Sequence, residues 1–484
     1  MVDYHLVVLV HGLWGNPSHL LYIEKQLENH FNEQALQHEQ VIIYKTGSHS
    51  GFLTYDGIDV NGKRIADEIL RETVSLSNNT ASKDRVTKFL IIGYSLGGLI
   101  SRFALGILYF QKYFDNIEPI NFISFCSPHV GVLAPGENIS VKLFNKIVPH
   151  FLAHSGYQLF LKDSKIVSPS SKLPNVNDLP LLVWMAETNS VFFKALQKFK
   201  YRSLYANIVN DKRTCWFTSA IEEADPFNSM SNENPSAYKL DYIKNYEPTV
   251  IDFSKPICYE KAAPPTSDNF DQGSKFQKFL IRKFNWLKVL GNLLLFTPLW
   301  SIFFIGSSLF QRFKLNRRVN DFFKDGSNSL IYLYDFINED SNNTNNSFDD
   351  LEMPKNLLNS HDNNDYLEAL GKEINNTIKD QTDTFVESVY DAMNSEYTDG
   401  YSIHNRDTSK EILKPNSDEF KLELTPQQNF IIEKLNTLIW NKFPILIRNT
   451  KAAHAAAIVR YQDDKFEEGK TVVNHLVNEV FQLS

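Results

Sequence analysis

A serine stands between two glycines at the point where a short apolar run gives way to a helical pattern. The run at residues 89–92 is rich in β-forming residues and leads into Gly93-Tyr94-Ser95-Leu96-Gly97, after which apolar residues recur at helical spacing. This pattern predicts a strand, a sharp turn and a helix. Such a turn requires small residues on both sides of the serine, and Gly93 and Gly97 supply them. The Ser95 hydroxyl is therefore expected to stand exposed as a nucleophile, although a glycine-rich turn without chemistry would carry the same residues.

A second apolar run, at residues 5–10, ends in His11-Gly12-Leu13-Trp14-Gly15. Gly12 lets the backbone turn there so that a peptide N–H faces the serine. Acyl transfer needs two such donors, because the tetrahedral intermediate carries a full negative charge on the former carbonyl oxygen. We assign them to the backbone N–H groups of Leu13 and Leu96. The His11 ring is expected to bond neighbouring backbone and orient this loop rather than to transfer protons.

A serine nucleophile needs a base, and in the strand-turn-helix arrangement the triad follows the order serine, acid, histidine. Of the thirteen histidines, His361, His404, His454 and His475 follow a plausible acid. His361 and His404 lie in polar, low-complexity sequence that cannot fix a ring. His475 falls within an amphipathic helical pattern and is the alternative. His454 follows a short strand pattern at residues 443–447 and precedes the last helix, so we expect it to be the base.

The expected acid is Asp211, at the end of the strand run 204–209. A carboxylate at the carboxyl edge of the sheet lies on the side where the serine turn opens. There it can orient the base and stabilise the imidazolium without taking its proton. The alternative is Asp225, in an acidic cluster at residues 222–225 that also fits a solvated loop.

Five segments together resemble the fungal and plant putative serine esterase family of Rog-type lipases, and in particular its members that are phospholipases of yeast lipid droplets. The resemblance implies an α/β-hydrolase that cleaves fatty-acyl esters, with Ser95, Asp211 and His454 as the triad. Triad chemistry of this kind is expected to need no metal or organic cofactor. The resemblance covers roughly residues 1–225 and 425–484. Cys215 and Trp216 depart from what many hydrolases carry after the acid. The segments are residues 10–15, 93–98, Ser127-Pro128-His129-Val130-Gly131, 210–211 and 453–454. His129 is expected to pack beneath the site.

The alternation of elements predicts an α/β fold with a mostly parallel sheet covered by helices on both faces. The expected strands lie at about 5–11, 41–45, 88–94, 119–125, 202–209 and 443–448, and the expected helices at 17–31, 60–76, 96–112, 427–441 and 467–482.

We expect a hydrolase core at 1–225 and 425–484, interrupted by an insertion at 226–424. A lid-like insertion is expected at about 132–200. Its apolar residues at helical spacing, from 139 to 161, fit a lid over an acyl pocket or an ordinary core helix. Residues 338–420 are rich in Asn, Asp and Ser and are expected to be mostly disordered.

One uncharged apolar stretch, at residues 289–310, is long enough to cross a bilayer as a helix. A single crossing would divide the triad, because Ser95 and Asp211 precede the stretch and His454 follows it. Pro298 lies near its middle, and basic residues flank both ends. We therefore expect a hairpin or an in-plane helix on the cytosolic side. A buried core helix or part of an acyl pocket is the alternative.

Composition narrows the function further. A net charge of −8 argues against a general nucleic-acid binder, and three scattered cysteines suit a reducing compartment rather than a disulfide framework or a metal site. Residues 6–10 have no basic leader or cleavage site, so no signal peptide is expected.

We expect a lipase or phospholipase attached to the cytosolic face of a lipid droplet, with the endoplasmic reticulum or mitochondrial surface as alternatives. Its partners would be a lipid substrate and a lipid surface. Deacylation of protein thioesters and a silent hydrolase fold that tethers partners to lipid remain open.

Overall fold

Six parallel strands form one sheet that carries the candidate site residues. The computed structural model describes residues 2–33, 39–77, 84–137, 139–164, 179–211, 213–227, 230, 238–260, 317, 319, 410–413 and 420–483. The sheet has the order β2-β1-β3-β4-β5-β9, and every neighbouring pair is parallel. This confirms the expected α/β-hydrolase type of architecture. The strands are β1 (Asp3–Val10), β2 (Glu39–Lys45), β3 (Arg85–Tyr94), β4 (Glu118–Phe125), β5 (Tyr201–Asn207) and β9 (Asn441–Ile445).

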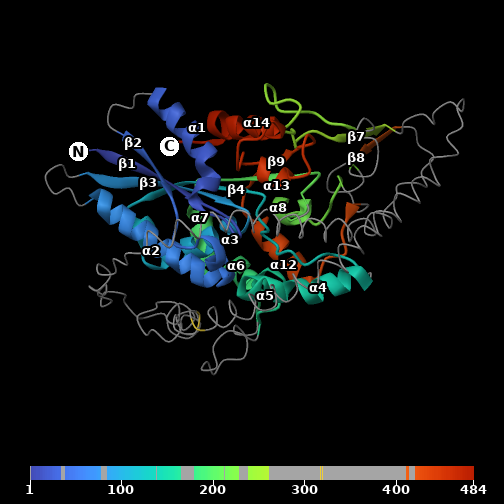
Figure 1. Ribbon diagram of the computed structural model, residues 1–484, viewed down its shortest axis with the longest axis horizontal. Helices are drawn as coiled ribbons and strands as arrows, with labels where there is room; N and C mark the ends of the chain where they lie inside the picture. Colours follow the sequence, from blue (N-terminus) through green and yellow to red (C-terminus); the bar gives the residue numbers. More distant parts are fainter. Residues whose placement is uncertain are drawn as a thin grey trace, which may run out of the picture.

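Both faces of the sheet are buried, which explains why its strands are continuous apolar runs instead of alternating ones. In β1, Leu6, Val8 and Val10 enter one hydrophobic cluster, while Val7 and Leu9 enter the cluster on the other face. Figure 1 shows α2 (Ile58–Ser77), α3 (Leu96–Phe110) and α7 (Val191–Lys198) on one face and α1 (Leu21–Glu33) and α14 (Glu467–His475) on the other. The sheet therefore holds the ends of its strands rigidly between two layers of helices.

The remaining helices are short and mostly follow strand ends. Those between β4 and β5 are α4 (Ile139–Phe151), α5 (Ala153–Leu159) and α6 (Leu181–Ala186), and α7 completes this stretch. Later come α8 (Trp216–Ala220), α12 (Pro426–Leu435) and α13 (Ala453–Ala456), and α14 continues into a π-helical turn at Leu476–Val480. Short 3-10 turns lie at Pro17–Leu20, Gly51–Tyr55, Tyr113–Asp115 and Asp464–Phe466. α6 is buried along its whole length, and α7 is buried apart from Lys194, Gln197 and Lys198, whereas α4 exposes part of its apolar surface.

The chain after the insertion completes the sheet. Thr425 caps α12 in a capping box with Gln428, and Pro426 occupies the first helical turn. α12 ends at Leu435, earlier than the expected residue 441, because the chain turns back there and the Trp440 indole donates to the Leu435 carbonyl. It then enters β9, which pairs with β5 in the register Ser203↔Asn441. Two segments more than 200 residues apart in sequence thus lie side by side.

A small antiparallel sheet of β6 (Tyr238–Lys239), β7 (Ile257–Glu260) and β8 (Lys410–Leu413) belongs to the insertion. The segment between β6 and β7 covers the free edge of β9, since the Ile251 N–H donates to the Pro444 carbonyl over 2.9 Å. The apolar stretch 289–310 and nearly all of the stretch 338–420 lie outside the described residues. Among the residues that are described, no helix combines the length and apolar character needed to cross a membrane.

Candidate active site

Ser95 lies at the sharp turn between β3 and α3. Its backbone has φ 55° and ψ −129°, a strained conformation for a residue with a side chain. The turn is held because the Ser95 N–H donates to the Phe125 carbonyl of β4 over 2.8 Å. Small neighbours are required here: a Cβ added to Gly97 would lie 2.3 Å from the Val10 carbonyl oxygen. The expected strand, turn and helix around Ser95 are all present.

The structure brings Ser95, His454 and Asp211 together in one hydrogen-bonded chain. The Nε2 atom of His454 lies 2.9 Å from Ser95 Oγ, and its Nδ1 atom lies 2.8 Å from Asp211 Oδ2. His454 stands on α13, and Asp211 follows β5 in the loop before α8. In the tautomer that carries the proton on Nδ1, Nε2 can accept the serine proton while Asp211 fixes the ring. This geometry equips Ser95 for nucleophilic attack.

Asp211 is buried and surrounded by donors. Its carboxylate accepts hydrogen bonds from the N–H of Arg213 and Thr214, the Thr214 hydroxyl and the Asn207 amide, as well as from His454. Burial by itself raises the pKa of this carboxyl group. The charge of His454 and the donated hydrogen bonds outweigh burial and lower the pKa to about 2. Asp211 is thus an anion wherever the protein is folded near neutral pH.

Two further side chains support the base. The Thr214 hydroxyl lies 3.1 Å from Asp211 Oδ2 and 3.2 Å from His454 Nδ1, so it bridges acid and base. The Tyr94 hydroxyl donates to the backbone carbonyl of His454 over 3.0 Å. Sequence reasoning did not single out either residue. Tyr94 stood within the serine motif, but nothing in the sequence shows that its side chain reaches back across the sheet to α13.

The loop after β1 lies directly against the nucleophile. A Cβ added to Gly12 would stand 2.6 Å from Ser95 Cβ, so only glycine permits this approach. Leu13 follows at once, and Leu96 begins α3, whose N-terminus presents unpaired N–H groups and the positive end of the helix dipole. Leu13 thus follows a glycine that lies against Ser95, and Leu96 follows Ser95 directly. That their N–H groups hold an oxyanion stays a prediction.

His11 bonds neighbouring groups of this loop, as its expected orienting role requires. Its Nδ1 atom lies 3.1 Å from the Gly12 carbonyl oxygen and its Nε2 atom 3.2 Å from Ser50 Oγ. The ring stacks on His49, with centroids 3.7 Å apart, and His49 donates from Nε2 to the His11 carbonyl over 3.1 Å. Burial lowers the pKa of His49 to about 4, which keeps it neutral at pH 7. His49 is a supporting residue that sequence reasoning missed.

The rival site residues lie elsewhere or outside the described residues. His475 is the last residue of α14 and is buried, with its Nδ1 atom 2.8 Å from the Tyr205 hydroxyl. Asp225 accepts a hydrogen bond from the Phe227 N–H and pairs through its backbone with Phe420. His361 and His404 fall outside the described part of the chain. His129 is fully buried, with Nε2 2.8 Å from Ser124 Oγ, in a packing position.

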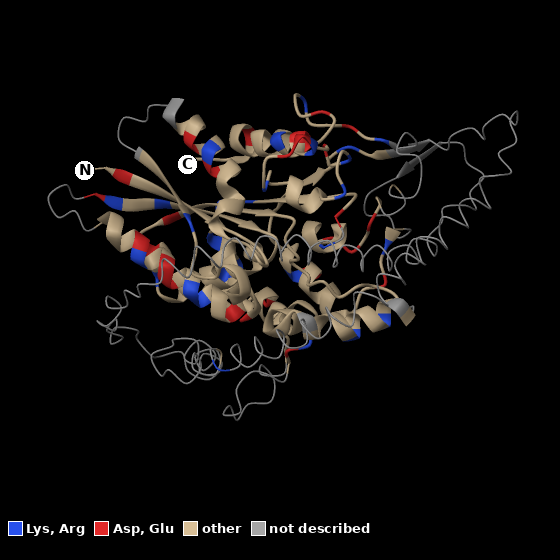
Figure 2. Cartoon of the chain, in the orientation of Figure 1, with Lys and Arg blue, Asp and Glu red and all other residues tan. Residues whose placement is uncertain are grey.

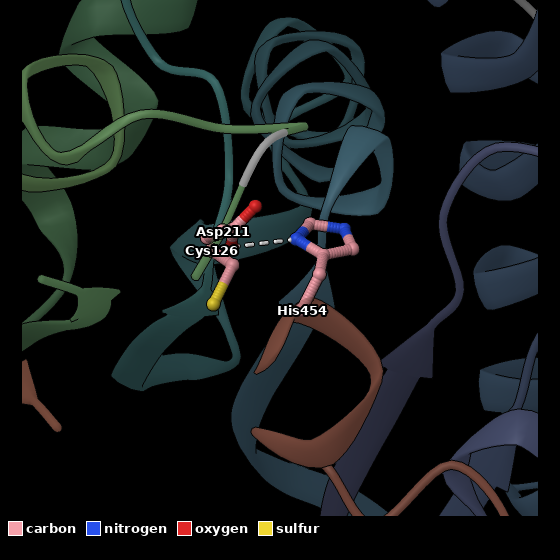
Figure 3. A group of neighbouring side chains, drawn as sticks. All are labelled: Cys126, Asp211 and His454. Atoms are coloured by element: carbon pink, nitrogen blue, oxygen red, sulfur yellow. Dashed lines mark hydrogen bonds and ion pairs between the residues drawn. The ribbon is translucent and has the colours of Figure 1, made fainter. Parts of the chain in front are cut away.

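Cys126 joins Asp211 and His454 in a compact group that Figure 3 shows, with the dashed line between Asp211 and His454. The potential ligand atoms of the three lie within 4.8 Å of one another, so the group has the donors of a soft metal site. However, burial and the neighbouring Asp211 charge raise the pKa of the Cys126 thiol, which favours its protonated form. A metal here would also displace the proton that His454 shares with Asp211. The group therefore fits a triad better than a metal centre.

Comparison with known proteins finds a family model and relatives that match part of this chain. The family model described as "Putative serine esterase (DUF676)" matches residues 2–222. "Putative lipase ROG1" of Saccharomyces cerevisiae is 29% identical over 259 residues, which cover 52% of this chain and 33% of that protein. "Putative lipase YDL109C" of the same yeast is 31% identical over 219 residues, covering 45% and 30%.

Among solved structures, phospholipase PlaB from Legionella pneumophila in complex with thio-NAD is similar at 15% identity and a TM-score of 0.26, over 46% of this chain and 41% of that chain. The matched part of this chain spans about a third of the length of the two yeast relatives. The family match ends before the segment that carries His454. It includes Ser95, Asp211 and the loop at Gly12, so the expected family resemblance is confirmed there. Residues 2–222 of this chain thus match the putative serine esterase family DUF676.

Proposed function

We propose that this protein is a serine hydrolase that cleaves fatty-acyl esters of lipids. The observation that carries the proposal is the unbroken chain of contacts from Ser95 Oγ through His454 to Asp211, at 2.9 Å and 2.8 Å. A silent scaffold has no physical need for all three groups in this geometry. The lipase names of the two yeast relatives support a lipid substrate.

The proposed reaction proceeds in two halves. Ser95 Oγ attacks the ester carbonyl while its proton passes to His454 Nε2, and Asp211 stabilises the imidazolium that forms. The N–H groups of Leu13 and Leu96 hold the negative oxygen. The intermediate then collapses, the alcohol leaves with the proton from His454, and the acyl group stays on Ser95. Water, activated by His454 in the same way, releases the fatty acid.

Phospholipids at the surface of a lipid droplet are the substrate and location that we propose within this class. β5 and β9 pair in one sheet, although the apolar stretch 289–310 separates them in sequence. A single crossing of a membrane between them would prevent that pairing. This supports attachment from one face, which is the only mode that a lipid monolayer permits. The endoplasmic reticulum and mitochondrial surfaces would accept the same mode of attachment.

Two measurements test the proposal. A fluorophosphonate probe should label the wild-type protein and leave Ser95→Ala unlabelled, while circular dichroism shows both folded. Purified wild-type protein should then release fatty acid from a panel of phospholipids and mono-, di- and triacylglycerols faster than from an acyl-cysteine peptide. If the probe did not label the folded wild type, the protein would not be a serine hydrolase, and the catalytically silent fold that tethers partners to lipid would remain. Faster release of fatty acid from the acyl-cysteine peptide would show that the protein is a protein deacylase and not a lipase.

A further inference from the structure

Helix α4 displays a row of exposed apolar side chains. Ile139, Leu143 and Ile147 are 87%, 55% and 41% exposed, and their spacing of four residues places them on one side of the helix. Val141 and Phe144, by contrast, are buried on the inner side. The helix therefore presents apolar surface to its own core and to the outside at once. A helix that only covers a core needs polar residues on its outer face.

The outer row is held in place by the packing of the inner face. The Asn145 side chain makes two hydrogen bonds of 2.9 Å with the backbone of Ala134, one to its N–H and one to its carbonyl. The Phe144 ring packs on Phe160 with centroids 5.5 Å apart. These contacts fix the rotation of α4, so the row of Ile139, Leu143 and Ile147 points outward as a property of the fold.

A row of positive charge runs beside the apolar row. Lys142 and Lys146 each precede an apolar member by one residue and are exposed, and Lys162 donates to the Asn145 carbonyl nearby. No acidic residue lies between 139 and 151, although Glu137 pairs with Lys142 at 3.6 Å. Figure 2 shows the colour of basic residues, and none of the colour of Asp and Glu, along α4. This is a local exception in a chain with a net charge of −8.

α4 lies toward the right of the molecule in Figure 1, as α8 and α13 do, beyond the ends of the strands. α13 carries His454. A surface bound by α4 would therefore lie on the same side of this view as the helix that carries His454.

We propose that α4 docks the protein on an anionic lipid surface. The apolar row enters the boundary between head groups and acyl chains, while Lys142 and Lys146 extend their ammonium groups to lipid phosphates. The inference rests on the proposed function and deepens it by naming the surface that places the site at its substrate. The paired rows favour lipid over a second copy of the chain, because a lysine row beside an apolar row matches the layered chemistry of a head-group boundary.

The test uses the full-length protein and four paired substitutions. Leu143→Asp with Ile147→Asp removes the apolar row, and Lys142→Glu with Lys146→Glu reverses the basic row. Val74→Asp with Ile439→Asp is the matched apolar control, because these residues are 50% and 81% exposed elsewhere. Lys194→Glu with Lys198→Glu is the matched charge control, since both lysines are exposed on α7 with the same spacing of four.

Co-sedimentation with phosphatidylcholine vesicles, with and without phosphatidylserine, measures docking. Wild type and both controls should bind better when phosphatidylserine is present, and each α4 variant should lose about tenfold in affinity for those vesicles. Hydrolysis of a water-soluble ester should stay unchanged in all four variants, which shows that they fold. Equal binding by the α4 variants and wild type would overturn the proposal. So would a wild-type dimer that the α4 variants dissociate, because that would identify a second copy as the occupant.

Failure of the docking surface and failure of the proposed function give different results. Ser95→Ala should bind vesicles as wild type does, because its hydroxyl takes no part in docking. A wild-type protein that binds vesicles through α4 but releases no fatty acid would overturn the hydrolase and leave the docking surface standing. If the wild type releases fatty acid but the α4 variants bind vesicles as well as the wild type does, the docking surface is overturned and the hydrolase stands.

Discussion

The Tyr94 hydroxyl donates a hydrogen bond of 3.0 Å to the backbone carbonyl of His454, so the residue before the proposed nucleophile holds the residue proposed as its base. The two rings also lie close, with centroids 5.0 Å apart. Tyr94 is buried, and its hydroxyl therefore ties α13 to the end of β3. The orientation of His454 depends on this contact as well as on Asp211.

Tyr94→Phe should keep the fold and slow ester hydrolysis. Removal of the hydroxyl leaves the His454 carbonyl without this donor, which costs about 1–3 kcal/mol of unfolding free energy for a buried acceptor. Looser placement of the ring should lower kcat by about tenfold. Urea unfolding and steady-state kinetics on a soluble ester measure the two effects. Wild-type kcat in the variant would show that Asp211 alone positions the ring.

His454→Ala should lower kcat by roughly 10³-fold or more, because the site loses its proton acceptor. His475→Ala is the matched comparison. It should leave kcat nearly unchanged but destabilise the protein, since His475 is buried against Tyr205 and bonded to its hydroxyl. Steady-state kinetics and thermal unfolding of both variants give the comparison. If kcat fell in His475→Ala and stayed nearly unchanged in His454→Ala, His454 would not be the base.

Thr214→Val should lower kcat about tenfold, because the hydroxyl that bridges Asp211 and His454 is lost while the side-chain volume is kept. Thr214→Ser retains the hydroxyl and should restore most of the rate. The pair separates hydrogen bonding from packing. If both variants were equally slow, the methyl group rather than the hydroxyl of Thr214 would be what the site requires.

Asp211 should contribute stability that is lost in acid. Its folded pKa of about 2 lies below the ordinary value of 3.8, so the folded state favours the anion. The contribution is therefore present above about pH 4 and disappears as pH falls through about 2, with a size on the order of 2 kcal/mol. The difference in unfolding free energy between wild type and Asp211→Asn should shrink over that interval. A difference that widens in acid would contradict the depressed pKa.

The pair of Asp59 and His154 should contribute stability that is lost as pH rises, which is the opposite of the pH dependence expected for Asp211. The two side chains lie 3.4 Å apart and are mostly buried, and the Gln158 amide donates to Asp59. Burial opposes the charged histidine, but Asp59 outweighs it and raises the pKa of His154 above 6.5. The stability from His154 is thus complete below pH 6.5 and is lost as pH rises through the raised value.

Thermal unfolding of wild type and His154→Gln between pH 6.5 and pH 9 tests this dependence. The amount by which wild type is more stable than His154→Gln should be largest at pH 6.5 and decline toward pH 9. Asp163, whose pKa burial raises to about 6, titrates mostly below this range and disturbs the comparison little. Asp59→Asn supplies the control, because it should abolish the pH dependence. A difference that grows with pH would contradict the assigned ion pair.

The sequence predicts the sheet well because its strands are buried on both faces. Continuous apolar runs such as 89–92 have no other place in a fold of this size, and the strands built from them lie within a few residues of the expected bounds. Ser95 could be found because its turn demands glycines in fixed positions. Helix ends were harder: α12 stops at Leu435 because of a tertiary contact with Trp440.

The supporting residues of the site could not be read from the sequence. Asn207, Thr214 and His49 act through contacts that appear only when separate segments pack together. Each is an ordinary polar residue without a motif, and its role depends on a direction that the side chain takes in space. The exposed row on α4 also follows from packing, since only Phe144 and its neighbours decide which of the apolar faces turns inward.

The pairing of β9 with β5 also has a consequence for biosynthesis. His454 follows Asp211 by 243 residues, and a ribosome that adds about 5–20 residues per second needs tens of seconds to make that interval. During this time the growing chain already carries Ser95 but has neither its base nor the last strand of the sheet. The nascent polypeptide is therefore catalytically inert, with the edge of β5 uncovered and open to chaperones. Synthesis of the segment that carries His454 is therefore the step that completes the chain of contacts from Ser95 to Asp211.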